Sequence, residues 1–232
     1  MDNLETILLK HSIKLSEDKL IKLDQFKKLV LEKNKVLNLT SITDEYEFDI
    51  KHLLDSLIIL NYLDFSTKKI QTVADLGTGA GIPGIPLAIA FPEISFTLID
   101  STSKKIAFID EVVEQLELRN VHTLASRVEE IKDKTFDLVL NRGFNKLSIN
   151  LELLTNLIKI NGEVWLYKTI KEIPTSNNNK VILQNLGLKF ENSINYKIDN
   201  NYDRVFIFYK KIQVQKSKYV RTYSLIKKNP IF

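Results

Sequence analysis

The chain has 232 residues, of which 44% are hydrophobic and 27% are charged, values that are ordinary for a globular protein. It has no cysteine, which excludes disulfides, thiolate metal sites and cysteine nucleophiles, and its three histidines are scattered, so no metal is expected. No apolar run approaches the ~20 residues that span a bilayer, and acids stand where a signal peptide carries basic residues, so we expect a cytoplasmic protein without a membrane partner.

The net charge of +4 is unevenly distributed along the chain. From Lys210 to Phe232 there are seven basic residues and no acid, whereas the remainder has 26 basic against 29 acidic residues. A basic tail on a neutral-to-acidic body is typical of a protein whose partner is an acidic polymer. A solvated tail in a lysine-rich protein is the alternative, and charge alone does not choose between them.

The first part of the chain has only helical patterns. Apolar residues recur near the helical period over Ser16–Leu37, and a shorter apolar turn covers Leu4–Leu9. Asp44, followed three residues later by Glu47, resembles a capping box that opens a second long helix, Glu45–Leu60. The sequence therefore predicts an N-terminal helical cap.

After the cap, short apolar runs alternate with helical stretches, which is the signature of βαβ units in a parallel sheet. The predicted strands are residues 72–76, 95–99, 121–125, 136–140 and 163–167. The predicted helices are residues 85–91, 104–116, a single turn at 128–131, 147–160 with Asn161-Gly162 as its stop, and 180–186.

Two further apolar runs, residues 189–198 and 204–211, are too close together to leave room for a helix between them. Such neighbours must be antiparallel, so we predict a hairpin at one end of the sheet. The whole pattern predicts an α/β protein with a doubly wound, mostly parallel sheet of about seven strands.

Four of the seven glycines fall in one stretch, DLGTGAGIPG (residues 75–84), between the first predicted strand and its helix. Open α/β sheets bind ligands at this edge, and glycine lets the backbone approach a ligand closely. Gly79 to Gly84 formally fit the dinucleotide fingerprint G-x-G-x-x-G, with Asp100 as the ribose acid. Asp75 argues against that interpretation, because a carboxylate at the end of the first strand would repel a pyrophosphate.

S-adenosylmethionine fits the same residues better, because it has no phosphate. Its methionyl end carries an ammonium and a sulfonium, which Asp75 would attract, and Asp100 would accept hydrogen bonds from the ribose hydroxyls. A tight turn without a ligand explains neither the four glycines nor the two acids. We therefore predict an S-adenosylmethionine site built from these acids and the loop residues Gly77, Thr78, Gly79 and Gly81.

Several motifs resemble those of one family. DLGTGAGIPGIPLAI, FTLIDSTSKKIAFI, ASRVEE and NRGF are similar to successive motifs of the bacterial ribosomal RNA small-subunit methyltransferase G family, also called glucose-inhibited division protein B. Asn38-Leu39-Thr40, His52-x-x-Asp55-Ser56 and the closing Lys227, Lys228 and Pro230 extend the resemblance over nearly the whole chain. It implies a class I, Rossmann-like methyltransferase that transfers a methyl group from S-adenosylmethionine to N7 of a guanine in 16S ribosomal RNA.

The resemblance also implies residue roles. The cofactor contacts would be Gly77 and Ile82 in the loop, Asp100 and Ser101 at the ribose, Val128 and Glu129 by the adenine, and Arg142 in the fourth-strand motif. Three features depart from the family pattern: Gly143 stands where alanine is usual, Thr169 stands where glycine is expected, and the tail RTYSLIKKNPIF has drifted. These departures affect the residues expected to contact the RNA substrate more than those expected to bind the cofactor.

The residues themselves are compatible with chemistry at guanine N7. This atom has a lone pair and no proton, so its methylation needs in-line positioning and no general base. Without a cysteine the chain lacks the nucleophile that pyrimidine C5 methylation needs, and Asn141-Arg142-Gly143-Phe144 is not the Asn/Asp-Pro-Pro-aromatic motif common in methylation of exocyclic amines. We predict that Arg142 positions cofactor or guanine, or forms a structural ion pair, and that Phe144 stacks on the base or lies in the core.

The basic residues predicted to contact RNA, with solvated surface charge as the alternative, are Lys104, Lys105, Arg127, Lys168, Arg221, Lys227 and Lys228. We expect a helical cap over residues 1–69, a methyltransferase domain over 70–211 and a basic tail over 212–232. The expected state is a monomer that acts on small-subunit rRNA, the 30S particle or its precursor. A small-molecule methyltransferase on the same fold and an NAD-dependent oxidoreductase are the alternatives.

Overall fold

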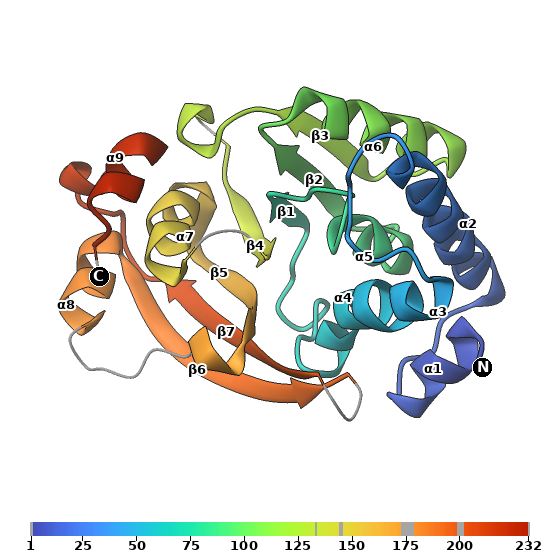
Figure 1. Cartoon of the computed structure of the whole chain (residues 1–232). Coiled ribbons are helices and arrows are strands. Elements are labelled where there is room, and N and C mark those ends of the chain that lie inside the picture. Colours follow the sequence, from blue (N-terminus) through green and yellow to red (C-terminus); the bar gives the residue numbers. More distant parts are fainter. Residues whose placement is uncertain (1, 133, 144–145, 173–178, 199–201, 232) are drawn as a thin grey trace.

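A seven-stranded sheet forms the centre of the protein. The structure is a computed structural model that describes residues 2–132, 134–143, 146–172, 179–198 and 202–231. Its strands are β1 (Thr72–Leu76), β2 (Ser95–Asp100), β3 (Val121–Ala125), β4 (Phe136–Arg142), β5 (Ile158–Thr169), β6 (Leu188–Lys197) and β7 (Asp203–Lys211). They follow the order β3-β2-β1-β4-β5-β7-β6, with β1 to β5 parallel and β7 antiparallel to β5 and β6 (Figure 1). The predicted α/β fold is confirmed, including the hairpin at one end of the sheet.

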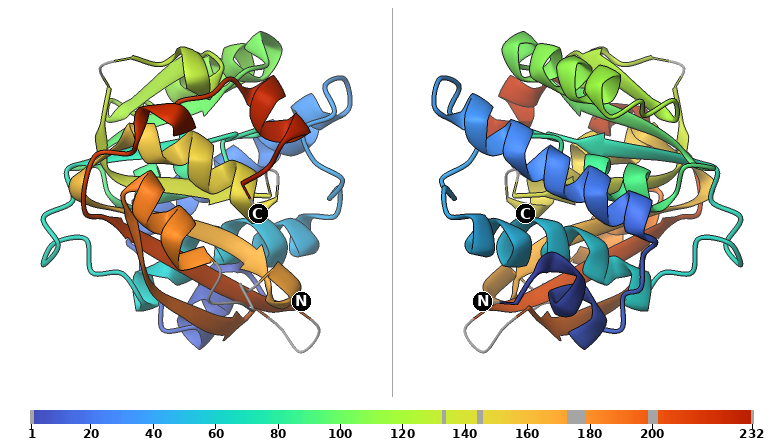
Figure 2. Two further views of the ribbon diagram at one scale, coloured as in Figure 1. Left: turned by 90° about the vertical axis from the view of Figure 1, so that its left-hand side faces the viewer. Right: turned by 90° about the vertical axis from the view of Figure 1, so that its right-hand side faces the viewer.

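Helices cover both faces of the sheet (Figures 1 and 2). One face carries α1 (Leu4–Lys10), α2 (Glu17–Asn34), α3 (Glu45–Phe48), α4 (Asp55–Leu57), α5 (Gly84–Ala90) and α6 (Ser103–Gln115), and the other carries α7 (Leu147–Leu154), α8 (Asn179–Leu186) and α9 (Tyr223–Lys228). Successive strand residues alternate between the two cores, so that Val73 packs on the α1–α6 side and Ala74 on the α7–α9 side. Among the helices that the structure describes, none is long and apolar enough to cross a membrane.

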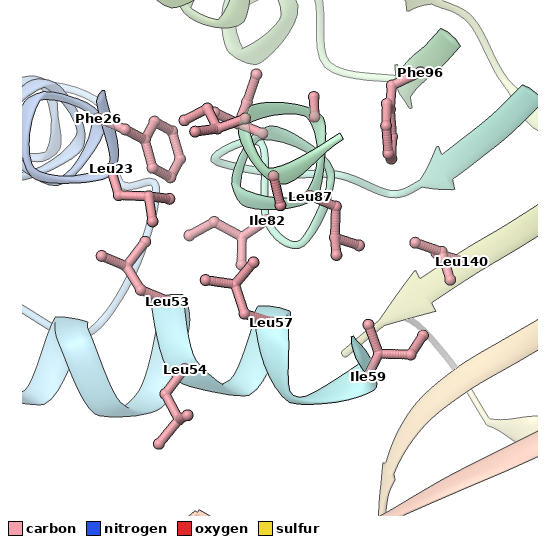
Figure 3. Close-up of a cluster of buried hydrophobic side chains, with 14 of the residues drawn as sticks. Leu23, Phe26, Leu53, Leu54, Leu57, Ile59, Ile82, Leu87, Phe96 and Leu140 are labelled. Atoms are coloured by element: carbon pink, nitrogen blue, oxygen red, sulfur yellow. The ribbon is translucent and has the colours of Figure 1, made fainter. Parts of the chain in front are cut away.

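The N-terminal helices belong to the same hydrophobic core as α5 and the sheet. Leu23 and Phe26 of α2 are fully buried and share one cluster with Leu53 and Leu57 (Figure 3). Leu87 of α5 lies in this cluster too. The sheet and the N-terminal helices therefore bury apolar surface against each other.

Two lysines of α2 form hydrogen bonds with the C-terminal ends of α5 and α6. Lys19 Nζ donates to the carbonyl oxygen of Ala90 at the end of α5 (2.7 Å), and Lys22 Nζ donates to that of Leu116, directly after α6 (2.6 Å). Carbonyls at a helix C-terminus lack intrahelical partners and carry the negative end of the helix dipole, so a cation is stabilising there.

The helical run after Asp44 contains a π-helical segment. Asp44 caps it as predicted, because its Oδ1 accepts a hydrogen bond from the backbone N of Glu47 (2.8 Å). A π-helix over Asp49–Leu54 then separates α3 from α4, and a 3₁₀-helix, Ile58–Asn61, ends the run. The predicted helix Glu45–Leu60 is therefore helical throughout, but it changes type at a position that often marks a functional site.

One predicted boundary is wrong. The helix predicted over 147–160 ends at Leu154, a 3₁₀ turn follows over Thr155–Leu157, and β5 begins directly afterwards. Asn161-Gly162, predicted as the helix stop, lies inside β5, where Asn161 has a φ of 68° and the pairing with β4 shifts register. Asn161-Gly162 therefore interrupts the regular pairing of β5 with β4. The apolar run before the pair is compatible with a strand as well as with a helix, which explains the wrong boundary.

Candidate active site

Asp75, in β1, forms hydrogen bonds with both ends of the glycine-rich loop that connects β1 to α5. Its side chain is fully buried, and Oδ2 accepts hydrogen bonds from Thr78 Oγ1 (2.6 Å) and Gly84 N (2.9 Å). A Cβ at Gly84 would lie 2.8 Å from this oxygen, so only glycine fits there without displacement. Burial raises the pKa of Asp75 to about 6, and its Oδ1 has no hydrogen-bond partner among the described residues.

The loop is also tied to the end of β2. The backbone N atoms of Gly77 and Thr78 donate to Ile99 O (2.8 and 3.1 Å), and Gly79 N donates to Asp100 Oδ2 (3.1 Å). Gly77 and Gly79 have φ values of 67° and 59°, which glycine adopts without a steric cost. Two carboxylates from neighbouring strands therefore fix the loop at the carboxyl edge of the sheet.

A pocket of about 260 Å³ opens beside the loop at the carboxyl ends of β1, β2 and β3, and we call it the β1–β3 pocket. It brings together five residues that were predicted to bind the cofactor: Gly77, Asp100, Ser101, Val128 and Glu129. The last two come from the 3₁₀-helix Val128–Glu130, close to the predicted turn. Arg127, predicted for RNA, is exposed at the same pocket.

The remaining loop residues predicted to bind the cofactor do not line this pocket. Asp75, Thr78, Gly81 and Ile82 are buried, and Gly79 is half-buried. Their observed contacts shape the loop, and a direct contact of any of them with the cofactor stays a prediction.

Sequence reasoning did not predict five lining residues of the β1–β3 pocket: Leu76, Ile99, Ser126, Leu153 and Tyr223. Of these, Tyr223 is the most distant in sequence from the first three strands. It is the first residue of α9, it lines the pocket, and its backbone N donates to Glu129 Oε1 (3.1 Å). No periodicity or spacing connects residue 223 to a pocket built by the first three strands. The fold brings Tyr223 there, because α9 packs beside α7 (Figure 1).

The basic tail is folded onto the protein. Ile226 of α9 is fully buried in the α7–α9 core, and Arg221 forms two hydrogen bonds with the fully buried Glu152, at 2.5 Å from Nε and 2.6 Å from Nη2. Lys211 is buried as well, and its Nζ donates to Thr155 O (2.9 Å) and Leu186 O (3.1 Å). The exposed cations of the tail are Lys216, Lys218 and, in the last turn of α9, Lys227 and Lys228.

A second pocket, of about 480 Å³, lies at the carboxyl ends of β4 and β5 and the start of β7, and we call it the β4–β7 pocket. Four cationic side chains line it: Lys51, Arg142, Lys168 and Arg204. The single carboxylate among its described lining residues is Asp55. Arg142, predicted as a cofactor contact, therefore lies in a pocket with a strong excess of positive charge.

Arg142 is held rigidly by the π-helical segment. Its Nη1 donates to Asp55 Oδ2 (2.8 Å) and to Lys51 O (3.0 Å), and its Nη2 donates to His52 Nδ1 (2.6 Å). His52 Nδ1 is therefore the acceptor, and the proton on Nε2 is donated to Thr40 Oγ1 (2.7 Å). Burial, followed by the charge of Arg142, lowers the pKa of His52 to about 3, so the ring is neutral at physiological pH.

Asp55 links this group to the hairpin. Its Oδ1 accepts a hydrogen bond from the Tyr196 hydroxyl on β6 (2.9 Å), and its side chain is 1% exposed. Tyr167 on β5 donates to Ser56 O (3.0 Å), and burial raises the pKa of both tyrosines, which keeps them protonated. The motifs Asn38-Leu39-Thr40 and His52-x-x-Asp55-Ser56 thus meet Arg142 in one hydrogen-bonded network.

The other residues predicted for RNA lie in different places. Lys104 is exposed and Lys105 half-buried in the first turn of α6, whereas Lys168 is only 3% exposed and lines the β4–β7 pocket. Phe144, predicted to stack on a base or to lie in the core, lies outside the described residues, as do residues 199–201 of the connection 199–203 between the two hairpin strands. Gly143 lines the β4–β7 pocket with a φ of 71°, a conformation that favours the glycine found there over the usual alanine.

Comparison with known proteins decides the family. The family model described as "rRNA small subunit methyltransferase G" matches residues 19–200. The chain is 32% identical to the ribosomal RNA small subunit methyltransferase G of Oenococcus oeni, over 99% of this chain and 97% of that protein. It is 38% identical to the protein of that name from Mycoplasma capricolum, over 89% of both chains. The chain belongs to the rRNA small subunit methyltransferase G family.

Solved structures agree on the fold. Magnesium protoporphyrin IX methyltransferase from Synechocystis matches with a TM-score of 0.57 at 14% identity, over 85% of this chain and 98% of that one. A SAM-dependent methyltransferase from Aquifex aeolicus matches with a TM-score of 0.50 at 20% identity, over 70% of this chain and 97% of that one. These likenesses concern the fold alone.

Membership of the rRNA small subunit methyltransferase G family confirms the family predicted from the sequence motifs. It also confirms the predicted activity, methyl transfer to small-subunit rRNA with S-adenosylmethionine as the methyl donor. The two alternatives, a small-molecule methyltransferase and an NAD-dependent oxidoreductase, do not fit this family.

Proposed function

We propose that the protein methylates N7 of one guanine in 16S rRNA, with the cofactor in the β1–β3 pocket and the guanine at the β4–β7 pocket. The observation that carries the proposal is the junction of the two pockets. Leu76 lines the first and Arg142 lines the second, and Asn141 Nδ2 joins their strands by donating to Leu76 O (2.7 Å). A donor in one pocket and an acceptor in the other would therefore meet at the ends of β1 and β4.

The β1–β3 pocket has the chemistry that the cofactor needs. Asp100 Oδ1 accepts from Thr102 N (2.8 Å) and Oδ2 accepts from Gly79 N, which leaves further lone pairs for the ribose hydroxyls. The unpartnered Oδ1 of Asp75 adds negative potential beneath the loop, which favours a cationic methionyl group above it. Gly77, Ser101, Val128 and Glu129 would complete the contacts.

The reaction needs positioning more than proton transfer. S-adenosylmethionine supplies a methyl group on a positively charged sulfur, and guanine N7 has a lone pair and no proton. His52, whose pKa is about 3, is therefore not required as a base. Arg142 would position the guanine, because hydrogen bonds to His52 and Asp55 fix its guanidinium in one orientation.

The proposal includes the finer identity of the substrate and the state of the enzyme. We place the reaction in the cytoplasm, on the 30S particle or a precursor, with the enzyme as a monomer. Methylation of naked 16S rRNA, assembled particles and precursors by equal amounts of enzyme would rank the substrates. Sedimentation of the enzyme at working concentration would give its oligomeric state.

The decisive test uses 7-deazaguanine at the target position, located beforehand by mapping 7-methylguanosine in the product. The analogue lacks the N7 lone pair but keeps the Watson–Crick edge, so binding should persist while methyl transfer stops. Transfer that survives the replacement would show that another atom is attacked.

A further inference from the structure

Arg204 stands at the start of β7 in the β4–β7 pocket. Because β7 runs antiparallel to β5, its first residues lie at the edge where β4 and β5 end, and Arg204 pairs with Thr169 in the β5–β7 register. The neighbouring pair in that register is Lys168 with Val205. The hairpin thus adds a second arginine to the pocket that already holds Arg142.

Within the part of the chain that the structure describes, Arg204 differs from Arg142 and Lys51, two other cations of the pocket. Arg142 is paired with Asp55, and Lys51 Nζ binds Glu47 Oε1 at 2.7 Å. Arg204 has no ion pair with a described residue, and its Nε is buried without a hydrogen-bond partner among them. A buried donor on a charged group costs free energy unless a hydrogen-bond partner satisfies it.

No anion of the described pocket wall is available to Arg204. Asp55 already accepts hydrogen bonds from Arg142 and Tyr196, and His52 is neutral. Tyr167, which also lines the pocket, stays protonated. An external anion with acceptor oxygens would satisfy the free donor of Arg204.

The chemistry of the reaction indicates which part of the substrate supplies that group. Methylation at N7 places a positive charge on the guanine, so the base itself is not the anionic partner of Arg204. A phosphodiester carries the opposite charge and matches the planar fork of an arginine. Phosphate contacts also fix the register of a nucleic acid without reading its bases.

We propose that Arg204 binds a phosphodiester of the RNA strand adjacent to the target guanosine, and so fixes the position of N7 relative to Arg142. This inference rests on the proposed function for the identity of the base. The contact itself needs only an RNA strand in the β4–β7 pocket. Arg204 is thus a positioning residue for the substrate.

The test compares Arg204→Gln with Arg119→Gln. Arg119 is exposed and precedes β3, at the opposite edge of the sheet, so its variant loses the same charge away from the pocket. We expect Arg204→Gln to weaken binding of a small-subunit rRNA fragment roughly tenfold and to reduce the salt slope by about 0.7. S-adenosylmethionine affinity and the melting temperature should stay at the wild-type values, and Arg119→Gln should behave as wild type in every measurement.

Arg204→Lys separates charge from packing. Lysine keeps the positive charge but lacks the planar pair of guanidinium donors. The salt dependence of RNA binding should therefore be retained, while part of the RNA affinity is lost. If Arg204 only supported the hairpin, both variants would lower the melting temperature and leave the salt slope unchanged. That result, or equal RNA affinity in all proteins, would overturn the inference.

The phosphate is identified with oligonucleotides that carry a neutral methylphosphonate at one position, protected by a 2′-O-methyl group. Neutralising the contacted phosphate should weaken binding to the wild type and have no further effect on Arg204→Gln. If every position next to the target weakens both proteins equally, the inference is wrong. Both readouts are binding measurements, so they can succeed when no 7-methylguanosine is formed, and the proposed function would then fail alone.

Discussion

Asp75 and Asp100 both bind the glycine-rich loop, although they belong to different strands. From the sequence, both were predicted as direct contacts of the cofactor. In the structure only Asp100 lines the β1–β3 pocket, while Asp75 is fully buried and hydrogen-bonded to Thr78 and Gly84. A motif places a residue near a ligand, but it does not distinguish a side chain that touches the ligand from one that shapes the loop.

Burial of Asp75 gives a prediction for stability. Its pKa is raised from 3.8 to about 6 in the folded state, so the folded protein binds this proton more tightly than the unfolded chain does. The free energy of unfolding should therefore fall as the pH rises from about 4 to about 6, and stay reduced above that range. The shift is about two units at about 1.4 kcal/mol each, a cost of roughly 2–3 kcal/mol at pH 7.

Asp75→Asn should remove this cost, because the amide stays neutral. We expect denaturant unfolding to show a variant that gains roughly 2–3 kcal/mol relative to wild type between pH 4 and pH 7. Its affinity for S-adenosylmethionine should decrease, since the negative potential under the loop is lost. A variant whose stability follows the wild-type pH profile would contradict the prediction.

At the scale of elements, the alternation of strands and helices was predictable from the sequence. The strands are short continuous apolar runs, and the helices between them have apolar residues at the helical period. The five parallel strands and their hairpin follow from this pattern. Two features did not. The π-helical segment at Asp49–Leu54 has the same apolar residues as an α-helix, and the end of α7 lies in an apolar run that suits helix and strand alike.

The tail element could not be predicted because its contacts are distant in sequence. Charge pattern alone made Arg221 a candidate for phosphate, whereas its guanidinium pairs with Glu152, 69 residues earlier. The same holds for Arg204 and Arg142, which meet in one pocket only through the strand order β4-β5-β7. Sequence spacing carries no information on such neighbours.

Tyr223 allows a test of α9 as a wall of the β1–β3 pocket. Tyr223→Ala removes an aromatic ring from the lining while its backbone N can still donate to Glu129. We expect affinity for S-adenosylmethionine to fall roughly 5- to 30-fold, measured by calorimetry, since one buried aromatic contact contributes about 1–2 kcal/mol.

The matched control is Leu225→Ala, which shortens an exposed side chain of the same helix. It should leave cofactor affinity within twofold of the wild type. If both variants bind equally well, α9 is not part of the cofactor site.

At the scale of the whole molecule, the two pockets divide one edge of the sheet between two layers of helices. The β1–β3 pocket is lined in part by Leu153 of α7 and Tyr223 of α9, whereas the β4–β7 pocket is lined by the N-terminal helical run and the hairpin. The chain termini thus contribute to opposite halves of the site. The basic tail, whose charge pattern predicted a contact with phosphate, also lines the β1–β3 pocket through Tyr223.

This arrangement changes what truncation should do. If the tail only contacted RNA phosphates, its removal would leave cofactor binding unchanged. Deletion of residues 212–232 would instead expose the α7–α9 core at Ile226, leave Glu152 buried without Arg221, and remove Tyr223 from the pocket. An uncompensated buried charge costs about 3–5 kcal/mol and loss of a buried isoleucine about 2–5 kcal/mol, against a total stability of about 5–15 kcal/mol.

We therefore expect the truncated chain to melt far below the full-length protein by circular dichroism and to lose binding of S-adenosylmethionine and RNA together. The double variant Lys227→Gln, Lys228→Gln is the matched comparison, because both side chains are exposed and the fold keeps its contacts. It should retain the melting temperature and cofactor affinity, and reduce the salt slope of RNA binding by about 1.4 if both lysines contact phosphate. A truncated protein with an unchanged melting temperature and cofactor affinity would show that the tail is dispensable for the fold and leave RNA binding as its only role.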